Sequence, residues 1–100
     1  MAYLDEIAAQ VRALSPPAQL EEADAEALFR LYAVLVLVKG EDTSAADVHH
    51  VWVAWKAERD PADPDIRPFE DLDERTQQAD EPFARAIRDV AARISTQRHA

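Results

Sequence analysis

Apolar residues recur at helical spacing along most of this chain. Between residues 2 and 14 they return every three or four positions, which predicts a helix that ends before Ser15-Pro16-Pro17. The apolar stripe of this helix is Leu4, Ile7, Ala8, Val11 and Leu14.

The second expected helix begins near Asp24, which would cap it, and ends at Lys39-Gly40. Its second half is apolar on every side, which is typical of a central core helix or of one half of a subunit interface. A short strand is the alternative for this run, because three of its residues are β-branched. These residues are Val34, Val36 and Val38.

A third helix is expected to run to about Arg59, with Thr43 or Ser44 as its cap and Asp47 as the acidic member of a capping box. Its buried stripe is expected to comprise Val48, Val51, Trp52 and Trp55. Residues 60–68 hold three of the six prolines and predict an irregular but ordered loop. A short helix over residues 72–78 and a last helix opened by Asp80-Glu81-Pro82 and ending near Thr96 complete the pattern. We therefore expect an all-α fold, a compact bundle of four to five helices with this proline-rich loop between helices three and four.

Composition narrows the class of protein further. With 100 residues, 48% of them hydrophobic, and a single glycine, the chain predicts one helical domain over residues 1–100 and little hairpin chemistry. The absence of cysteine removes disulfides and thiolate chemistry, and the formal charge of −9 argues against direct binding of nucleic acid. The N-terminus does not read as a signal peptide, and the longest apolar run, eight residues, is far below the roughly 20 that span a bilayer. We expect no membrane contact and a cytoplasmic location.

Aromatic residues supply the main candidate for a binding surface. Trp52 and Trp55 lie one turn apart and would form an apolar wall, across which a proline-stiffened loop would lay Ile66 and Phe69. On this interpretation, Trp52→Ala would cost about 3 to 5 kcal/mol of stability.

The same region carries a wider pattern. Its positions are His49, Val51, Trp52, Pro64, Ile66, Pro68, Phe69, Leu72, Asp80 and Ala84. Over about half of the chain, with its core near residues 45–95, this pattern resembles one repeat of the ryanodine receptor (RyR) domain. The resemblance implies a non-catalytic binding or interaction module that recognises a protein partner or a small ligand. The groove it implies is bordered by His49, Trp52, Pro68 and Phe69. Gln77 and Glu81 stand where that family often has basic residues, which removes positive charge.

The chain as a whole is similar to small acidic proteins of unknown function from actinobacteria and their phages. Tyr3-Leu4-Asp5 and the stretch from Ala27 to Tyr32 share in this likeness, which implies no particular activity. RyR repeats occur as tandem pairs in the channel, whereas one copy is present here. Our hypothesis is that a homodimer supplies the second copy, with the apolar face of the second helix as the interface.

Catalysis and metal binding find little support in the residue spacing. His49 and His50 point about 100° apart on a helix, so they are poorly placed to share one ion. The aspartates of residues 60–65 lack the spacing and the glycine of a calcium loop. No phosphate-binding glycine motif is present. We expect no enzyme activity, no metal and no cofactor.

Charge is unevenly distributed along the chain. Residues 60–81 hold nine acids and two bases, a balance of −7, and the expected acidic edge within them is Glu70, Asp71, Asp73 and Glu74. A solvated face is the simple interpretation, and a general acid–base pair is disfavoured because nothing on an exposed turn would separate the two pKa values. The alternative function is an acidic inhibitor or nucleic-acid mimic that docks on a basic host protein.

Overall fold

A central helix organises this fold, and three of the other α-helices pack against it. The computed structural model describes residues 2–17 and 19–99, and this part of the chain is all-helical, without a strand. The α-helices are α1 (Ala2–Leu14), α2 (Glu22–Val38), α3 (Ala45–Arg59), α4 (Glu74–Gln78) and α5 (Glu81–His99), and the two 3-10 turns are η1 (Gly40–Asp42) and η2 (Phe69–Asp71). The predicted all-α class is confirmed, and the strand alternative for residues 34–38 is wrong.

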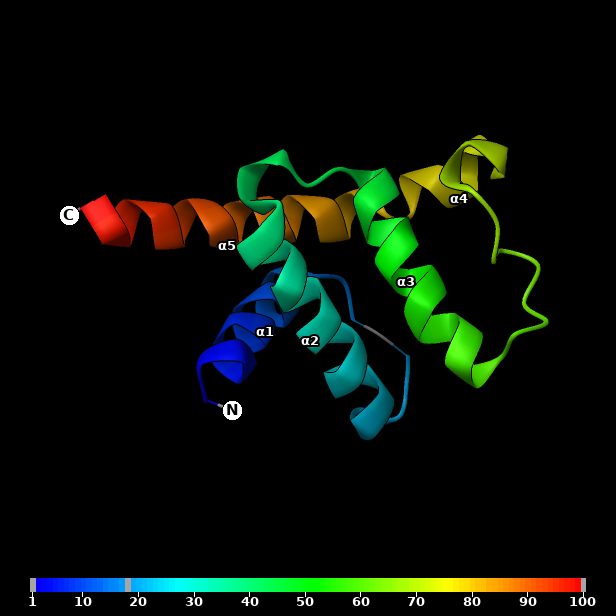
Figure 1. The fold of residues 1–100 in the computed structure, drawn as a ribbon, viewed down its shortest axis with the longest axis horizontal. Coiled ribbons are helices and arrows are strands. Elements are labelled where there is room, and N and C mark those ends of the chain that lie inside the picture. The colour runs from blue at the N-terminus through cyan, green and yellow to red at the C-terminus, as the bar shows by residue number, and fades with distance from the viewer. Residues whose placement is uncertain (1, 18, 100) are drawn as a thin grey trace.

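The long helix α5 lies across the directions of α2 and α3. In Figure 1, α4 leads into the long α5 along one side of the molecule, while α1, α2 and α3 lie below it. Helix α2 contacts α1, α3 and α5, which makes it the centre of the core. The largest fully buried apolar side chains come from four helices and are Phe29, Ile7, Ile87, Val11, Val48 and Val90.

Local sequence signals fix the turn between α2 and α3. Gly40 has a φ of 57°, a left-handed conformation that side chains with a Cβ rarely adopt, so α2 stops where the sequence predicts. The hydroxyl of Ser44 accepts a hydrogen bond from the Asp47 amide at 3.2 Å, and the Asp47 carboxylate accepts one from the Ser44 amide at 2.9 Å. The predicted capping box is confirmed with Ser44 as the cap.

Two predictions about the first half of the chain are wrong. Helix α2 begins at Glu22 with Glu21 in the cap position, so Asp24 lies inside the helix, where its carboxylate accepts a hydrogen bond from Arg59 Nε at 3.1 Å. The Asp24 carboxylate is therefore bound to Arg59 on α3 and does not cap α2. Leu14, assigned to the buried stripe of α1, is 40% exposed because the chain turns away there toward Pro16.

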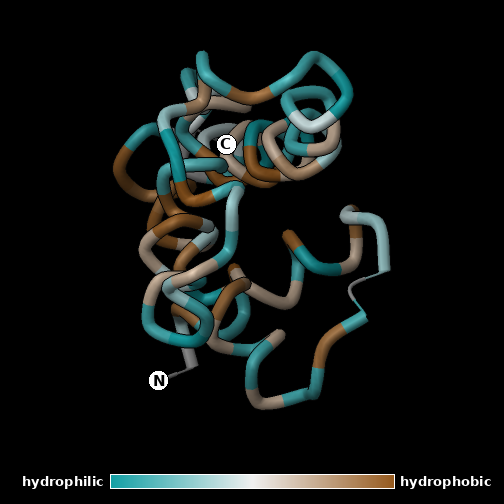
Figure 2. Tube along the Cα trace, turned by 90° about the vertical axis from the view of Figure 1, so that its right-hand side faces the viewer, coloured by the Kyte–Doolittle hydropathy of each residue, from teal (hydrophilic) through white to brown (hydrophobic). Residues whose placement is uncertain are grey.

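One side of α2 is apolar and open to solvent. Leu31, Val34, Leu37 and Val38 are exposed, whereas the residues between them are buried. Figure 2 shows hydrophobic and hydrophilic positions alternating along the chain. The homodimer interface expected on this face stays a prediction. None of the described helices is long and apolar enough to cross a membrane.

The segment from residue 60 to residue 68 is built of turns and bends. Short-range hydrogen bonds hold it: the Asp63 amide donates to the Asp60 carbonyl and the Ile66 amide to the Asp63 carbonyl, both at 3.1 Å. The Arg67 side chain turns back on the same segment, donating from Nε to the Pro64 carbonyl at 2.7 Å. The segment therefore brings the main chain near Arg67 to a fixed place beside α3.

Candidate functional site

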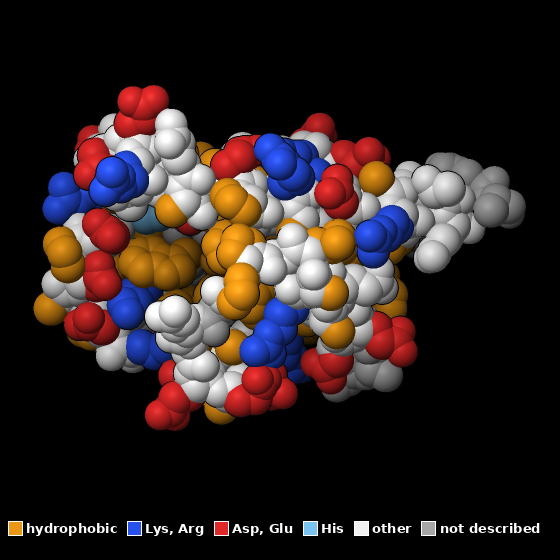
Figure 3. All heavy atoms as spheres, turned by 180° about the vertical axis from the view of Figure 1, so that it is seen from behind, with side chains coloured by type: hydrophobic (Ala, Val, Ile, Leu, Met, Phe, Trp, Pro, Cys, Tyr) orange, Lys and Arg blue, Asp and Glu red, His pale blue; other side chains and the backbone are white. Residues whose placement is uncertain are grey.

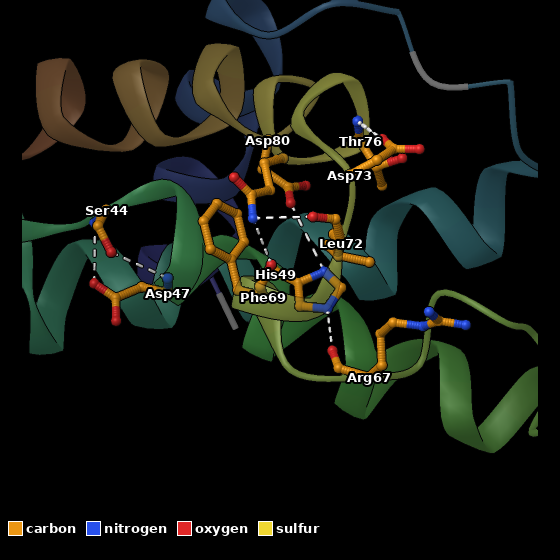
Figure 4. Close-up of polar contacts among 10 residues, drawn as sticks. Ser44, Asp47, His49, Arg67, Phe69, Leu72, Asp73, Thr76 and Asp80 are labelled. Atoms are coloured by element: carbon orange, nitrogen blue, oxygen red, sulfur yellow. Dashed lines mark hydrogen bonds and ion pairs between the residues drawn. The ribbon is translucent and has the colours of Figure 1, made fainter.

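A buried histidine joins three separate parts of the chain. His49 on α3 is 3% exposed, and its Nε2 lies 2.7 Å from the carbonyl oxygen of Arg67. A carbonyl oxygen only accepts, so Nε2 carries the proton and donates it. Nδ1 lies 3.7 Å from Oδ2 of Asp80, at the junction of α4 and α5. Figure 4 shows the imidazole between these two partners, with the ring of Phe69 beside it.

The carboxyl group of Asp80 is unusual in its protonation. Burial raises its pKa to about 6, and repulsion from Asp65 adds to this, while attraction to His49 acts in the opposite direction. Asp80 directly precedes α5, and its carbonyl accepts a hydrogen bond from the Ala84 amide at 3.1 Å, as its predicted place at the opening of that helix requires. Its carboxylate lies beside His49, where it is 17% exposed.

Two polar side chains brace the backbone around this pair. Gln77 Nε2 donates to the carbonyls of Phe69 at 2.9 Å and Leu72 at 3.1 Å. The carboxylate of Asp73 accepts from the Thr76 amide at 2.8 Å and caps α4, as its predicted place near the start of that helix implies. Gln77, at one of the two positions where the RyR repeat often has a basic residue, thus holds the backbone in place. Glu81, at the other position, accepts a hydrogen bond from Arg88 at 2.7 Å.

The two tryptophans of α3 face different surroundings. Trp52 is half-buried and stacks on the His49 imidazole, with ring centroids 5.7 Å apart and an interplanar angle of 22°. Trp55 is 4% exposed, and the guanidinium of Arg59 lies 4.5 Å from its ring centroid. Its indole N–H is buried and has no hydrogen-bond partner among the described residues. The expected single wall of two indoles is therefore wrong: each ring lines a hollow of its own.

Trp52 forms part of a hollow of about 320 Å³. Figure 3, the view from behind, shows a hollow with a hydrophobic floor, a small patch of histidine, and acidic and basic side chains around its rim. The residues that line the hollow come from the α1–α2 connection, α2, α3, the proline-rich segment, α4 and α5. They are Gln19, Leu20, Leu28, Tyr32, His49, Trp52, Asp65, Thr76, Ala79, Asp80 and Phe83.

The structure places two of the four residues of the predicted groove in the lining of this hollow. His49 and Trp52 line the hollow, but Pro68 and Phe69 do not: Pro68 is exposed at the start of η2, and the Phe69 ring packs against His49 with centroids 6.0 Å apart. The Arg67 carbonyl accepts a hydrogen bond from His49 Nε2. Phe69, two residues later, therefore packs against the imidazole and does not cover Trp52. The four residues of the expected acidic edge, Glu70, Asp71, Asp73 and Glu74, are all exposed on η2 and the start of α4.

Sequence reasoning missed several lining residues. Tyr32 and Phe83 lie 5.7 Å apart between ring centroids and belong to a cluster with Phe29. Their helical spacing fits ordinary core positions equally well, so the sequence pattern does not mark them as lining residues. The signal available for Asp80 was its place in the motif together with His49, since both are polar residues in an otherwise apolar pattern.

Other features of the described chain give weaker sites. Four other hollows, of about 480, 430, 380 and 370 Å³, are larger, but none of them joins a cluster of aromatic rings to a carboxylate–imidazole pair. Within residues 2–17 and 19–99, no group of three His, Cys, Asp or Glu side chains is placed to hold a metal ion. The hollow over Trp52 is the best candidate site.

Asp80→Asn gives a stability test of this site. A carboxyl pKa raised from 3.8 to about 6 means that the folded protein binds more protons than the unfolded chain between these pH values, so stability falls as the pH rises through this window. The groups facing Asp80 are His49 on α3, Asp65 in the proline-rich segment and Tyr32 on α2. Between pH 4 and pH 7 the free energy of unfolding of the variant should therefore rise, relative to that of the wild type, by on the order of 2 kcal/mol.

Urea denaturation of both proteins across this pH range measures the difference. Asp71→Asn, which makes the same charge change on an exposed residue, is the matched control. A difference between wild type and Asp80→Asn that stays constant with pH would show that Asp80 is not the group in question.

Comparison with known proteins identifies the family of this chain. No curated protein and no solved structure matches it. A family model, described as a domain of unknown function (DUF7701), matches residues 2–92, and the chain belongs to that family.

Proposed function

We propose that this protein is a non-catalytic binding module that takes an external chemical group into the hollow over Trp52. The observation that supports this most is the half-buried Trp52 indole, which lines a hollow of about 320 Å³ together with the buried His49 imidazole and the partly buried Asp80 carboxylate. A large aromatic surface with a few fixed polar groups is typical of ligand sites. The resemblance to the RyR repeat supports the same class of function.

The geometry favours binding over catalysis. His49 Nε2 donates to a main-chain carbonyl at 2.7 Å, so that nitrogen is not free to act as a base toward a substrate. Nδ1 faces Asp80 and is the only other nitrogen of the ring. His49 and Asp80 therefore hold the elements around the hollow in place. The occupant would be a side chain of a partner protein or a small ligand. The location would be the cytoplasm.

A fragment screen by NMR tests this proposal. We expect hits to shift the Trp52 indole N–H signal and the amides of Thr76 and Ala79, which line the hollow. Trp52→Ala should weaken each hit at least about tenfold, because one aromatic contact supplies about 1.4 kcal/mol or more. Val34→Ala, which shortens an exposed apolar side chain outside the hollow, should leave the affinity unchanged.

Two results would contradict the proposal. The first is a screen whose hits all shift residues outside the hollow, such as those of the exposed face of α2. The second is a Trp52→Ala variant that keeps its fold by circular dichroism and binds the hits as tightly as the wild type.

The acidic edge supports a second candidate function, docking on a basic protein. Glu70 and Asp71 are exposed on η2, and Asp73 and Glu74 follow at the start of α4. Two of these carboxylates already have partners within α4, since Asp73 caps the helix and Glu74 accepts from Gln78 at 3.2 Å. Binding at this edge would weaken steeply in 0.5 M salt, whereas binding in the aromatic hollow would change much less.

A further inference from the structure

The charges that line the hollow over Trp52 all have one sign. Two carboxylates, Asp65 and Asp80, are among its lining residues, and the described lining includes no lysine or arginine. Arg67, whose carbonyl binds His49, donates from its guanidinium Nε to the Pro64 carbonyl, and Figure 4 shows that side chain pointing away from His49 and Asp80. An anionic group in the hollow would be repelled by both of these lining carboxylates.

Aromatic faces supply the second half of the site. Trp52, Tyr32 and Phe83 line the same hollow, and Tyr32 and Phe83 lie 5.7 Å apart between centroids. The faces of such rings carry partial negative charge and attract cations, the indole most strongly. Elsewhere in this molecule the surface of Trp55 already holds a cation, the guanidinium of Arg59, at 4.5 Å. No such contact is recorded for the Trp52 ring among the described residues, although the ring is half-buried.

We propose, on the basis of the proposed function, that the occupant of the hollow is an organic cation, an alkylammonium group that sits against Trp52 and between the carboxylates of Asp65 and Asp80. The 3.7 Å separation of Asp80 from His49 leaves that carboxylate without a short charged partner on the imidazole side. A bound ammonium group would supply one. The raised pKa of Asp80, in which burial outweighs the attraction to His49, is consistent with a carboxylate whose charge its neighbours in the protein compensate only in part.

The sharpest test compares two probes of the same shape. Choline and its neutral isostere dimethylbutanol differ only in that carbon replaces the quaternary nitrogen. Titration of the full chain, followed by the Trp52 indole N–H signal, should show choline binding at least about tenfold more tightly, since cation–π and carboxylate attraction act on the charged probe alone. Two further probes are butylammonium, a simple alkylammonium ion, and Nα-acetyl-lysine amide, which carries the charged ε-ammonium group of a lysine side chain. Binding of either probe supports the cation.

Matched variants locate the charge. Asp65→Asn should weaken choline several-fold and leave the neutral isostere unchanged, because Asp65 is exposed and lines the hollow. Asp60→Asn removes an equal charge from an exposed residue outside the lining and should have no effect on either probe.

Equal affinity for choline and its isostere would overturn the cation and leave the binding module intact. The same conclusion follows if fragments bind in the hollow while no ammonium probe does. If no probe or fragment reaches Trp52 at all, the proposed function itself fails, so the two failures are distinguishable.

Discussion

Trp55→Ala is expected to lower the free energy of unfolding by about 3 to 5 kcal/mol, the range for a large aromatic side chain removed from a core. Trp55 is 4% exposed and belongs to the main apolar cluster. Its removal would also deprive the Arg59 guanidinium of the ring 4.5 Å away. Trp52→Ala should cost less, about 1 to 2 kcal/mol, because Trp52 is only half-buried and leaves no closed cavity.

Urea denaturation of the two variants at one pH measures this difference. The sequence alone predicts a loss of about 3 to 5 kcal/mol for Trp52→Ala, so the experiment distinguishes that prediction from the smaller loss expected from the structure. A larger loss for Trp52→Ala, or equal losses, would mean that Trp52 belongs to the closed core and does not floor an open hollow.

His49→Ala is expected to cost about 2 to 3 kcal/mol. The variant loses the hydrogen bond to the Arg67 carbonyl and the contacts of the imidazole with Trp52 and Phe69. A hydrogen bond contributes about 1 kcal/mol, and the loss of a buried ring adds the rest. The expected loss is several times that of an ordinary surface substitution.

His50→Ala is the matched control, because His50 is the next residue on the same helix and is exposed. It should change stability by less than about 0.5 kcal/mol. Thermal and urea unfolding of both variants check the pair. Equal losses would contradict the placement of His49 as the residue that joins α3 to the proline-rich segment.

Local chemistry explains which parts of the fold the sequence predicts. The start of α3 depends on a capping box within four residues, and the end of α2 depends on one glycine, so neither needs tertiary information. Asp24 shows the limit of this reasoning. Its propensity to cap a helix is real, but an arginine 35 residues later binds it inside the helix.

The candidate site depends much more on tertiary structure. Trp52 and Trp55 are separated by about 60° around the helix axis, so they are neighbours in the pattern. Which elements pack beside each ring decides whether they share a surface, and the pattern does not contain that information. The same holds for the carbonyl that His49 meets, since residue type does not specify which main-chain oxygen a loop will present.

Intermolecular NOEs between the protein and the tightest ligand from the fragment and ammonium probes test the central claim most directly. We predict NOEs to the ring protons of Trp52 and Phe83, which line one hollow from α3 and α5. NOEs that instead reach Trp55, Leu31 or Val34, the lining of the hollow on the other side of α3, would contradict it.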